Sequence, residues 1–221
     1  MMNRRTFAGS ISTIAAAGAA GAASAGAGVA GRPFKLMYAP GFRHFIHSAG
    51  KAPLDQIQFM HDNGFRALED NGMMNRDPAL QQKIGDKLAA LEMTMGVFVL
   101  GFGMYTNRLT SNIPDGEKRK VDRQAVRESI RKNCLDAIET SKRVNAKWCT
   151  IVLGADNDNL DYDYQFSNVV ENLKFASELL EPHGLVMVME PLNYMNHPGV
   201  FLKTVPQAYT IAKAVGSPSC K

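Results

Sequence analysis

One unbroken apolar run near the end of the chain constrains the fold more than any other feature. Residues Leu185–Met189 are all apolar, and they lead directly into Glu190 and Pro191. An apolar run without alternation is typical of a strand that is buried on both faces, as in a parallel sheet. Because Pro191 has no N–H to continue the ladder, the strand is expected to end at Glu190. The run therefore predicts a parallel sheet with a carboxylate at the carboxyl end of a strand.

Strand and helix patterns alternate through the rest of the chain, and long polar loops follow two of the strands, at 101–122 and 154–163. Alternation of this kind predicts a parallel sheet with right-handed crossovers. Five strand–helix units fit either an open doubly wound sheet or part of an eight-unit barrel. The strands are predicted at 34–38, 65–69, 95–100, 148–153 and 185–190, and the helices at 53–62, 78–91, 126–138, 169–180 and 205–215.

Several common functional motifs are missing from the sequence. Gly101-Phe102-Gly103 lacks the third glycine of a dinucleotide-binding turn, and no P-loop or G-x-S-x-G elbow is present. The loop Asp156–Asp161 superficially resembles a calcium loop, but it has neither the glycine at the sixth position nor the glutamate at the twelfth. We interpret it as a solvated, turn-forming loop.

Charge and cysteine content exclude two further classes. The net charge is only +4, and the one cluster of cations is Lys118-Arg119-Lys120, which gives little support for a nucleic-acid partner. None of the three cysteines forms a close-spaced metal pair. Cys134 lies on a helix pattern and Cys149 on a strand pattern, so both are predicted to be small buried hydrophobic residues.

Residues 1–31 are predicted to be a twin-arginine signal peptide. Asn3-Arg4-Arg5-Thr6-Phe7 is followed by a run rich in Ala and Gly and by the small-residue site Ala23-Ser24-Ala25. A membrane anchor is the alternative, but the run is short and rich in glycine, so no stable membrane insertion is expected. The sequence thus predicts export, for example to the periplasm, with residues 32–221 forming a single partial barrel.

The candidate catalytic residues lie where predicted strands end. Glu190 ends the fifth strand, and Glu69 with Asp70 ends the second. In a barrel of alternating strands and helices, the carboxyl ends of the strands carry the chemistry. Carboxylate and imidazole ligands at such a rim suit a divalent cation such as Mn or Mg. The alternative is a strand-end glutamate that simply pairs with a lysine or arginine.

Polar side chains in the loops after the strands are candidates for substrate binding. Asn193 and His197 follow the fifth strand, and His44 follows the first. With Glu69 they could hydrogen-bond a polyol. Loop capping by the asparagine and a solvated histidine are the alternative interpretation.

With these residues identified, the chain resembles the xylose isomerase-like TIM-barrel superfamily, and most of all its hydroxypyruvate isomerase branch. The resemblance covers about residues 34 to 221. It rests on three stretches, the most specific of which is the last: Gly64-Phe65-Arg66-Ala67-Leu68-Glu69-Asp70-Asn71-Gly72, Met95-Gly96-Val97-Phe98, and Glu190-Pro191-Leu192-Asn193 with His197-Pro198-Gly199.

The resemblance implies an α/β fold of the (β/α)8 type, here incomplete with about five units. It also implies a divalent metal (Mn, Mg or Co) held by four residues at the ends of strands five to eight. Of these four ligands only Glu190 has a counterpart in this chain. The implied activity is metal-dependent isomerisation or epimerisation of a small sugar or hydroxy-keto acid, in which Glu190 also transfers a proton.

Two other functions are weighed against this activity. One is a non-catalytic carbohydrate-binding barrel. The other is a DNA-repair endonuclease of the same superfamily, which would need several histidines at strand ends for a multi-zinc site. The predicted strands two, three and four end instead in Glu69, Leu100 and Leu153, and an exported location also argues against this function.

We expect the chain to be a fragment of a longer reading frame or a truncated gene product. Five strands do not close a barrel, so the first and fifth would have open edges, which a homo-oligomer could join. Because three of the four implied ligands have no counterpart, we predict that this 221-residue chain binds the metal poorly and shows no isomerase turnover. A turnover assay with added Mn²⁺ checks this, and robust activity would refute it.

Overall fold

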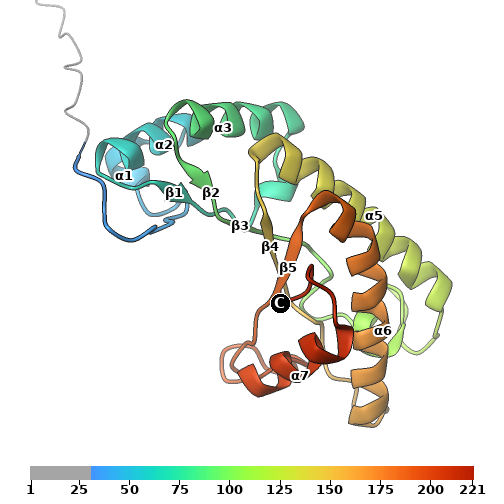
Figure 1. The fold of residues 1–221 in the computed structure, drawn as a ribbon. Coiled ribbons are helices and arrows are strands. Elements are labelled where there is room, and N and C mark those ends of the chain that lie inside the picture. The colour runs from blue at the N-terminus through green and yellow to red at the C-terminus, as the bar shows by residue number, and fades with distance from the viewer. Residues whose placement is uncertain (1–30) are drawn as a thin grey trace, which may run out of the picture.

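The structure is a computed structural model that describes residues 31–221. All but the last residue of the predicted signal peptide lies outside the described part of the chain. Short parallel strands form a curved layer, and the main helices follow its outer side (Figure 1). In chain order the elements are α1 (Ile46–Ala49), α2 (Pro53–Asp62), β1 (Ala67–Leu68), η1 (Met73–Asn75), α3 (Pro78–Ala90), β2 (Thr94–Met95), β3 (Val97–Val99), α4 (Arg108–Ser111), α5 (Arg123–Val144), β4 (Trp148–Ile151), α6 (Tyr162–Leu180), η2 (Glu181–His183), β5 (Val186–Met189) and α7 (Val205–Val215).

The strands are parallel, as the alternation of patterns predicts. β1 pairs with β2, and β3, β4 and β5 form a second sheet in that order. The predicted third strand is divided at Gly96, because its first half pairs with β1 and its second half with β4. Backbone bonds still connect the two sheets: Gly96 N donates to Leu68 O (2.7 Å) and Asp70 N to Val97 O (3.1 Å).

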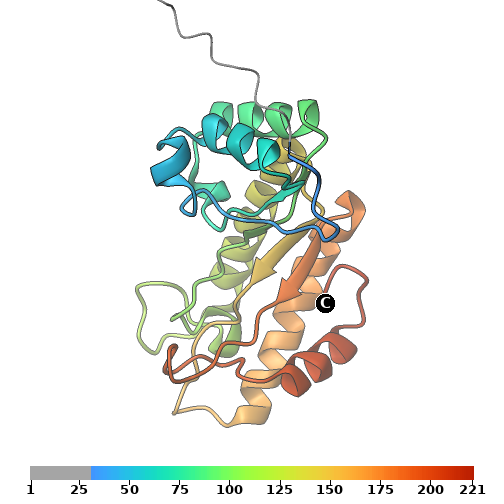
Figure 2. The same ribbon diagram turned by 90° about the vertical axis from the view of Figure 1, so that its left-hand side faces the viewer.

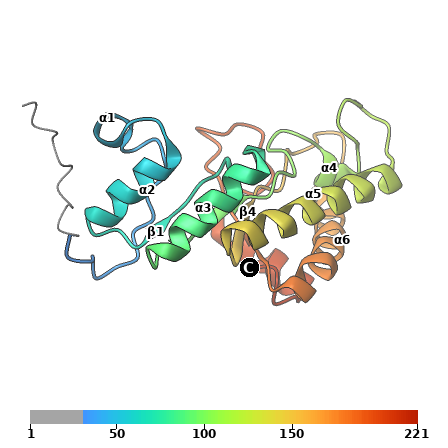
Figure 3. The ribbon, with the colours of Figure 1, turned by 90° about the horizontal axis from the view of Figure 1, so that it is seen from above.

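The helices bury one face of these strands. Helix α5 packs between α3 and α6, and Figure 3 shows α2, α3, α5 and α6 following one another along the outside. Helix α3 begins where the sequence predicts, with Asp77 accepting hydrogen bonds from Ala79 N and Leu80 N. No described helix has the length and apolar content needed to span a membrane. The predicted stripe of α5 is fully or almost fully buried: Val126, Ile130, Cys134 and Ile138.

The cysteines belong to this core, which confirms the prediction that Cys134 and Cys149 are buried hydrophobic residues. All three are buried and free. Burial raises the pKa of the Cys134 thiol to about 12 and the pKa of the Cys220 thiol to about 11. Burial also raises the pKa of Cys149, with a smaller contribution from nearby Cys134. Such thiols stay protonated near neutral pH, so they are structural rather than reactive.

The prediction of a first strand at 34–38 is wrong. Phe34 N donates to Gly64 O (3.0 Å), but Tyr38 N turns back to Leu36 O (3.0 Å), so no ladder forms. The Phe34 ring instead packs on Phe65, with the ring centroids 4.9 Å apart. The apolar pattern here therefore reflects aromatic packing, not strand pairing.

The prediction that the fifth strand is buried on both faces is also wrong. Met187 and Met189 are buried among the helices, whereas Val186 and Val188 are only half-buried on the opposite face. The same alternation occurs in β3 and β4, so within the described chain the inner face of the sheet is partly open. Figure 2 shows β4 and β5 in front of the helices that cover their other face.

The edge of β5 is not open, contrary to our expectation. Residues 219–221 run parallel to β5. Met187 N donates to Ser219 O (2.9 Å), Lys221 N to Met187 O (2.8 Å) and Met189 N to Lys221 O (2.7 Å). These bonds satisfy edge groups that would otherwise be exposed.

The loop at 101–122 is more ordered than its polar composition suggests. It contains α4, whose residues are buried and pack against α6. Asn172 Nδ2 donates to Leu109 O (3.1 Å) and to Asn112 Oδ1 (3.0 Å), and Asn168 Nδ2 donates to Thr110 O (2.9 Å). Asparagines on α6, the helix after β4, thus hold the loop that follows the neighbouring strand β3.

The close approach of α3 and α5 generates a stability prediction. A Cβ at Gly85 would overlap the carbonyl oxygen of Arg143. Alanine normally stabilises a helix interior by about 1 kcal/mol relative to glycine. Gly85→Ala is instead expected to lower the free energy of unfolding by about 2 kcal/mol, because α3 must move away from α5. Urea unfolding measures the change.

Gly101→Ala is the control for this variant, because a Cβ at Gly101 would meet nothing within 4 Å. It should leave the unfolding midpoint nearly unchanged. If Gly85→Ala were as stable as Gly101→Ala, the close approach of the two helices would be contradicted.

Candidate functional site

The loops after β3, β4 and β5 are joined at the carboxyl ends of these strands. Ala155 N donates to Thr106 O (2.9 Å), and Asn107 Nδ2 donates to Ala155 O and Asp156 O (both 3.1 Å). An isolated antiparallel bridge joins Ala155 to Val200. One rim of the molecule is therefore built from three segments that are far apart in sequence.

Glu190 lies at this rim, as predicted. Its N–H donates to Ile151 O (3.0 Å), so its backbone still continues the ladder of β5. Because side chains alternate along a strand, Glu190 shares the inner face with Val186 and Val188. Its side chain is exposed, and within residues 31–221 its carboxylate makes no hydrogen bond or ion pair. The alternative of a strand-end glutamate paired with a cation does not apply in the described chain.

Glu69 and His44 line a pocket of about 430 Å³ beside the end of β1. Glu69 is half-buried, and its side chain has no hydrogen-bond partner among the described residues. His44 Nδ1 lies 2.9 Å from Gly41 N, from which it accepts in one tautomer, and 3.1 Å from Gly41 O, to which it donates in the other. The pocket thus combines a carboxylate with an imidazole.

Asp70, the neighbour of Glu69, is already paired. Its Oδ2 accepts from Arg76 Nε (2.5 Å), and its Oδ1 accepts from Gly72 N (3.2 Å). The Arg76 guanidinium also lies over the Phe42 ring, with its carbon 4.8 Å from the ring centroid. Asp70 therefore shapes the wall of this pocket, while Glu69 keeps a free carboxylate.

Asn193 and His197 lie on the loop after Glu190 and not in the pocket of Glu69. Asn193 Oδ1 accepts from Asn196 N (3.0 Å), and Asn193 O accepts from His197 N (3.0 Å). The asparagine oxygen therefore caps its own loop, which is the alternative considered from the sequence. β1 and β5 are three interstrand steps of about 4.8 Å apart along the sheet. The structure thus places the five predicted residues in two groups on one rim.

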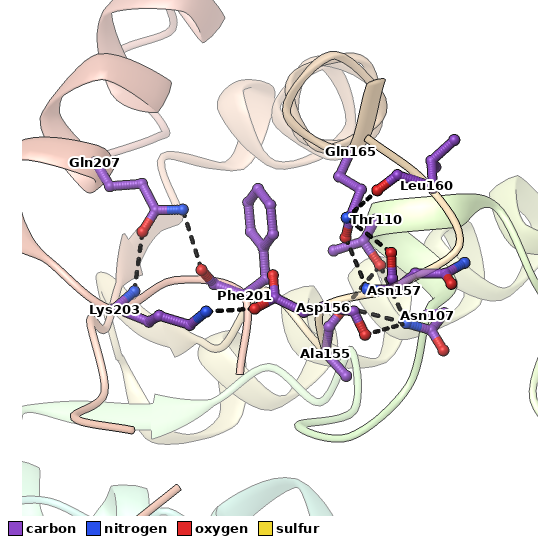
Figure 4. Close-up of polar contacts among 10 residues, drawn as sticks. All are labelled: Asn107, Thr110, Ala155, Asp156, Asn157, Leu160, Gln165, Phe201, Lys203 and Gln207. Carbon is purple, nitrogen blue, oxygen red and sulfur yellow. Dashed lines mark hydrogen bonds and ion pairs between the residues drawn. The ribbon is translucent and has the colours of Figure 1, made fainter. Parts of the chain in front are cut away.

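A pocket of about 530 Å³ lies between the loops after β4 and β5. A glutamine from the first turns of each following helix clamps each loop (Figure 4). Gln165 accepts from Asn157 N (2.9 Å) and donates to Leu160 O (2.6 Å). Gln207 accepts from Lys203 N (3.0 Å) and donates to Phe201 O (3.0 Å). Both loops are thereby fixed by the helices that follow them.

Charged and aromatic side chains complete the lining of this pocket. Lys203 Nζ forms an ion pair with Asp156 Oδ2. The half-exposed ring of Tyr162 stacks on the buried ring of Phe201, with centroids 5.6 Å apart and planes at 19°. A polyol-sized ligand would meet amide, carboxylate and aromatic groups together.

Sequence reasoning did not identify the residues of this pocket. One signal was available, because Thr204 and Gln207 have the spacing of a capping box, in which the side chain of a first-turn glutamine reaches back to the preceding backbone. Asn157 Oδ1 accepts from Asn159 N (3.0 Å), which confirms the predicted turn in its loop. No local sequence pattern indicates that Asp156 pairs with Lys203, which lies on another loop.

The described residues do not form a metal centre. No three histidine, cysteine, aspartate or glutamate side chains lie close enough together within residues 31–221 to hold an ion. Glu190 is one potential ligand, and its own loop adds amides and a single imidazole, while Asp156 on the adjacent loop is paired with Lys203. The divalent metal implied by the resemblance does not fit this donor set.

Comparison with known proteins agrees with this architecture. The sequence model of a family described as xylose isomerase-like TIM barrel matches residues 57–221. A Drosophila melanogaster protein provisionally named hydroxypyruvate isomerase is 24% identical over 190 residues. This match covers 82% of the chain but only 64% of the relative.

Three solved structures show the same fold. They are AP endonuclease, family 2, from Brucella melitensis (TM-score 0.60, 22% identity), D-psicose 3-epimerase with D-tagatose from Clostridium cellulolyticum H10 (0.59, 12%) and the IolI protein with a bound zinc atom (0.57, 15%). Each match covers 82% of this chain, and 65%, 61% and 60% of those chains respectively. At these identities the likeness concerns the fold.

Gly154 gives a test of how the rim is held. It has φ +86°, and a Cβ there would lie 2.5 Å from Thr106 O, the acceptor for Ala155 N. Gly154→Ala is expected to lower the free energy of unfolding by about 3 kcal/mol, combining left-handed strain with displacement of the loop. Amide hydrogen exchange at Ala155 should also become faster.

Gly116→Ala is the matched control, because Gly116 has φ +85° but open space around it. Its free energy of unfolding should fall by about 1 kcal/mol, which is the backbone strain alone. Equal losses in the two variants would mean that the contact with Thr106 does not hold the rim.

Proposed function

Because the chain belongs to the xylose isomerase-like TIM barrel family, we propose that the protein is an isomerase or epimerase of a small sugar or hydroxy-keto acid. The name of the Drosophila relative and the epimerase among the similar structures support this class of reaction. The observation that carries the proposal is the free carboxylate of Glu190 on the open inner face, at the carboxyl end of β5.

Glu190 would act as the base that moves a proton between carbons. A hydrogen on the carbon next to a carbonyl is acidic, so a positioned carboxylate can remove it while the electron pair shifts to the carbonyl oxygen. Return of the proton to the neighbouring carbon, while the hydroxyl proton passes to the former carbonyl oxygen, gives the isomer. Delivery of a proton to the opposite face of the same carbon, from a second donor on that face, gives the epimer. No atom is gained or lost, so the chemistry requires placement and not a co-reactant.

The loop residues would bind and orient the substrate. Asn193 and His197 follow Glu190 on the same loop, and their amide nitrogen and imidazole can contact hydroxyl groups. Glu69 and His44 would contact the distal end of the substrate from the pocket beside β1. In this proposal the two groups of residues serve opposite ends of one ligand.

A divalent metal, where the family uses one, would polarise the carbonyl and the adjacent hydroxyl. The name of one similar structure records a zinc atom in that protein. Because residues 31–221 lack a suitable cluster, no step is assigned to a metal here. This is the basis for expecting low turnover from the 221-residue chain.

A non-catalytic carbohydrate-binding protein is the second candidate. The pocket between the β4 and β5 loops supports it, since Tyr162 and Gln165 offer an aromatic ring and an amide, and the carboxylate of Asp156 is already paired with Lys203. A DNA-repair role has less support, because the strands that lead to Glu69, Leu100 and Leu153 do not end in histidine.

The proposal is tested by locating the site at which a substrate binds. Hydroxypyruvate or a ketose is titrated into the chain, and backbone amide shifts are followed by NMR. We expect shifts in the loop after β5 and beside Glu69. Glu190→Gln should weaken binding about fivefold, because about 1 kcal/mol of hydrogen bonding to the ligand is lost.

Glu181→Gln is the control, since Glu181 is exposed and bonds Ser217 outside the rim. It should bind as the wild type does. Shifts confined to the pocket of Tyr162 and insensitive to Glu190→Gln would favour the carbohydrate-binding alternative. No shift with any of these ligands would contradict both functions.

A further inference from the structure

A basic groove lies on the outer side of the molecule, on the helix α5 that follows the loop 101–122. Arg123, Arg127 and Arg131 recur every four residues along α5, so they share one face of the helix. With Phe175 of α6 they line a groove of about 560 Å³. We call this the α5 groove.

The guanidinium groups in the α5 groove are ordered by an aromatic ring. The carbons of the Arg127 and Arg131 guanidiniums lie 5.3 and 5.1 Å from the centroid of the Phe175 ring. Cation–π contact at these distances is attractive. Two like charges are thus gathered on one ring, an arrangement that an incoming anion would stabilise further.

The cations of the groove are poorly neutralised. A nitrogen of Arg123 lies 3.6 Å from a carboxylate oxygen of Glu171, and a nitrogen of Arg131 lies 3.7 Å from one of Glu128. All four side chains are about half exposed or more. Ion pairs this long and this exposed are weak and are screened by salt. Arg127 makes no ion pair within the described chain.

The net charge of the protein is concentrated beside this groove. Residues 117–132 hold seven cations and three acids, so their net charge is 7 − 3 = +4. The whole chain has the same net charge of +4, which means that the remaining residues sum to zero. Seven cations in one segment make a field that attracts anionic partners. They are Lys118, Arg119, Lys120, Arg123, Arg127, Arg131 and Lys132.

We propose that the α5 groove docks an extended acidic segment of a partner protein. Four residues of helix advance about 6 Å, and two residues of an extended chain advance about 6.6 Å. A peptide with an acid at every second position would therefore bring successive carboxylates opposite successive arginines. Carboxylates suit these forked donors, because the pairs can be bidentate.

A peptide fits the groove better than a single-stranded nucleic acid. Bases in such complexes stack on free aromatic faces. The Phe175 ring is already in contact with two guanidiniums and is only partly exposed, so it offers no free platform. The groove thus presents charge without a stacking surface.

The experiment measures binding of a fluorescent peptide of about sixteen alternating Glu and Ser residues at low salt. The 221-residue chain should bind it, and the same peptide with Gln for Glu should not bind. Arg127→Gln with Arg131→Gln should weaken binding at least tenfold. Phe175→Leu, which keeps every charge, should weaken it about threefold by releasing the two guanidiniums.

Lys142→Gln with Lys213→Gln is the matched control, because it removes the same charge from exposed helix positions that lie outside the groove and outside residues 117–132. It should change affinity less than threefold, and thermal unfolding confirms that each variant folds. Equal losses in both double variants, or no binding by the wild type, would overturn the proposal. Tighter binding of single-stranded DNA or of anionic phosphatidylglycerol vesicles through the same arginines would also overturn it.

Discussion

The parallel ladder of backbone hydrogen bonds is the constraint on which the rest of this structure depends. Because every strand runs in the same direction, every loop that follows a strand emerges on one side of the sheet. The ladder crosses the break at Gly96 and continues through β5 to residues 219–221. Glu69 and Glu190, more than a hundred residues apart, thereby lie on one rim. The fold is of the TIM-barrel type, and the described strands form one arc of it.

The same arrangement separates three surfaces with different chemistry. Helices bury the outer face of the strands, which supplies most of the apolar core. The inner face, lined by Val186 and Val188, is half-exposed and leads directly to Glu190. The far side of the helices carries the arginines of α5. A ligand at the rim and a partner at α5 would therefore meet different residues, and neither would displace the other.

Local sequence signals were sufficient wherever local physics decides the structure. The start of α3 at Asp77 and Pro78, the buried stripe of α5 and the strand before Glu190 all occur where they were predicted. The failures are long-range. Segment 34–38 has a strand-like pattern but packs through its aromatic rings. Polar loop 101–122 is held by asparagines of α6, whose partners no local pattern shows. Gln207 differs from these cases, because sequence reasoning also missed it although its capping-box spacing from Thr204 is a local pattern.

The acids of the rim show most clearly what position alone leaves undecided. Glu69 and Asp70 are neighbours at the end of β1, yet Arg76 neutralises Asp70 while Glu69 stays free. Sequence reasoning grouped the two, because both follow the strand directly. Only the turn through η1, which brings Arg76 back over Phe42, distinguishes them. A carboxylate with a fixed cationic partner is held as part of the wall, whereas one without a partner can accept a proton from a ligand. Glu69 and Glu190 meet that condition in the described chain, so the chemistry of the rim depends on which acids the fold leaves unpaired.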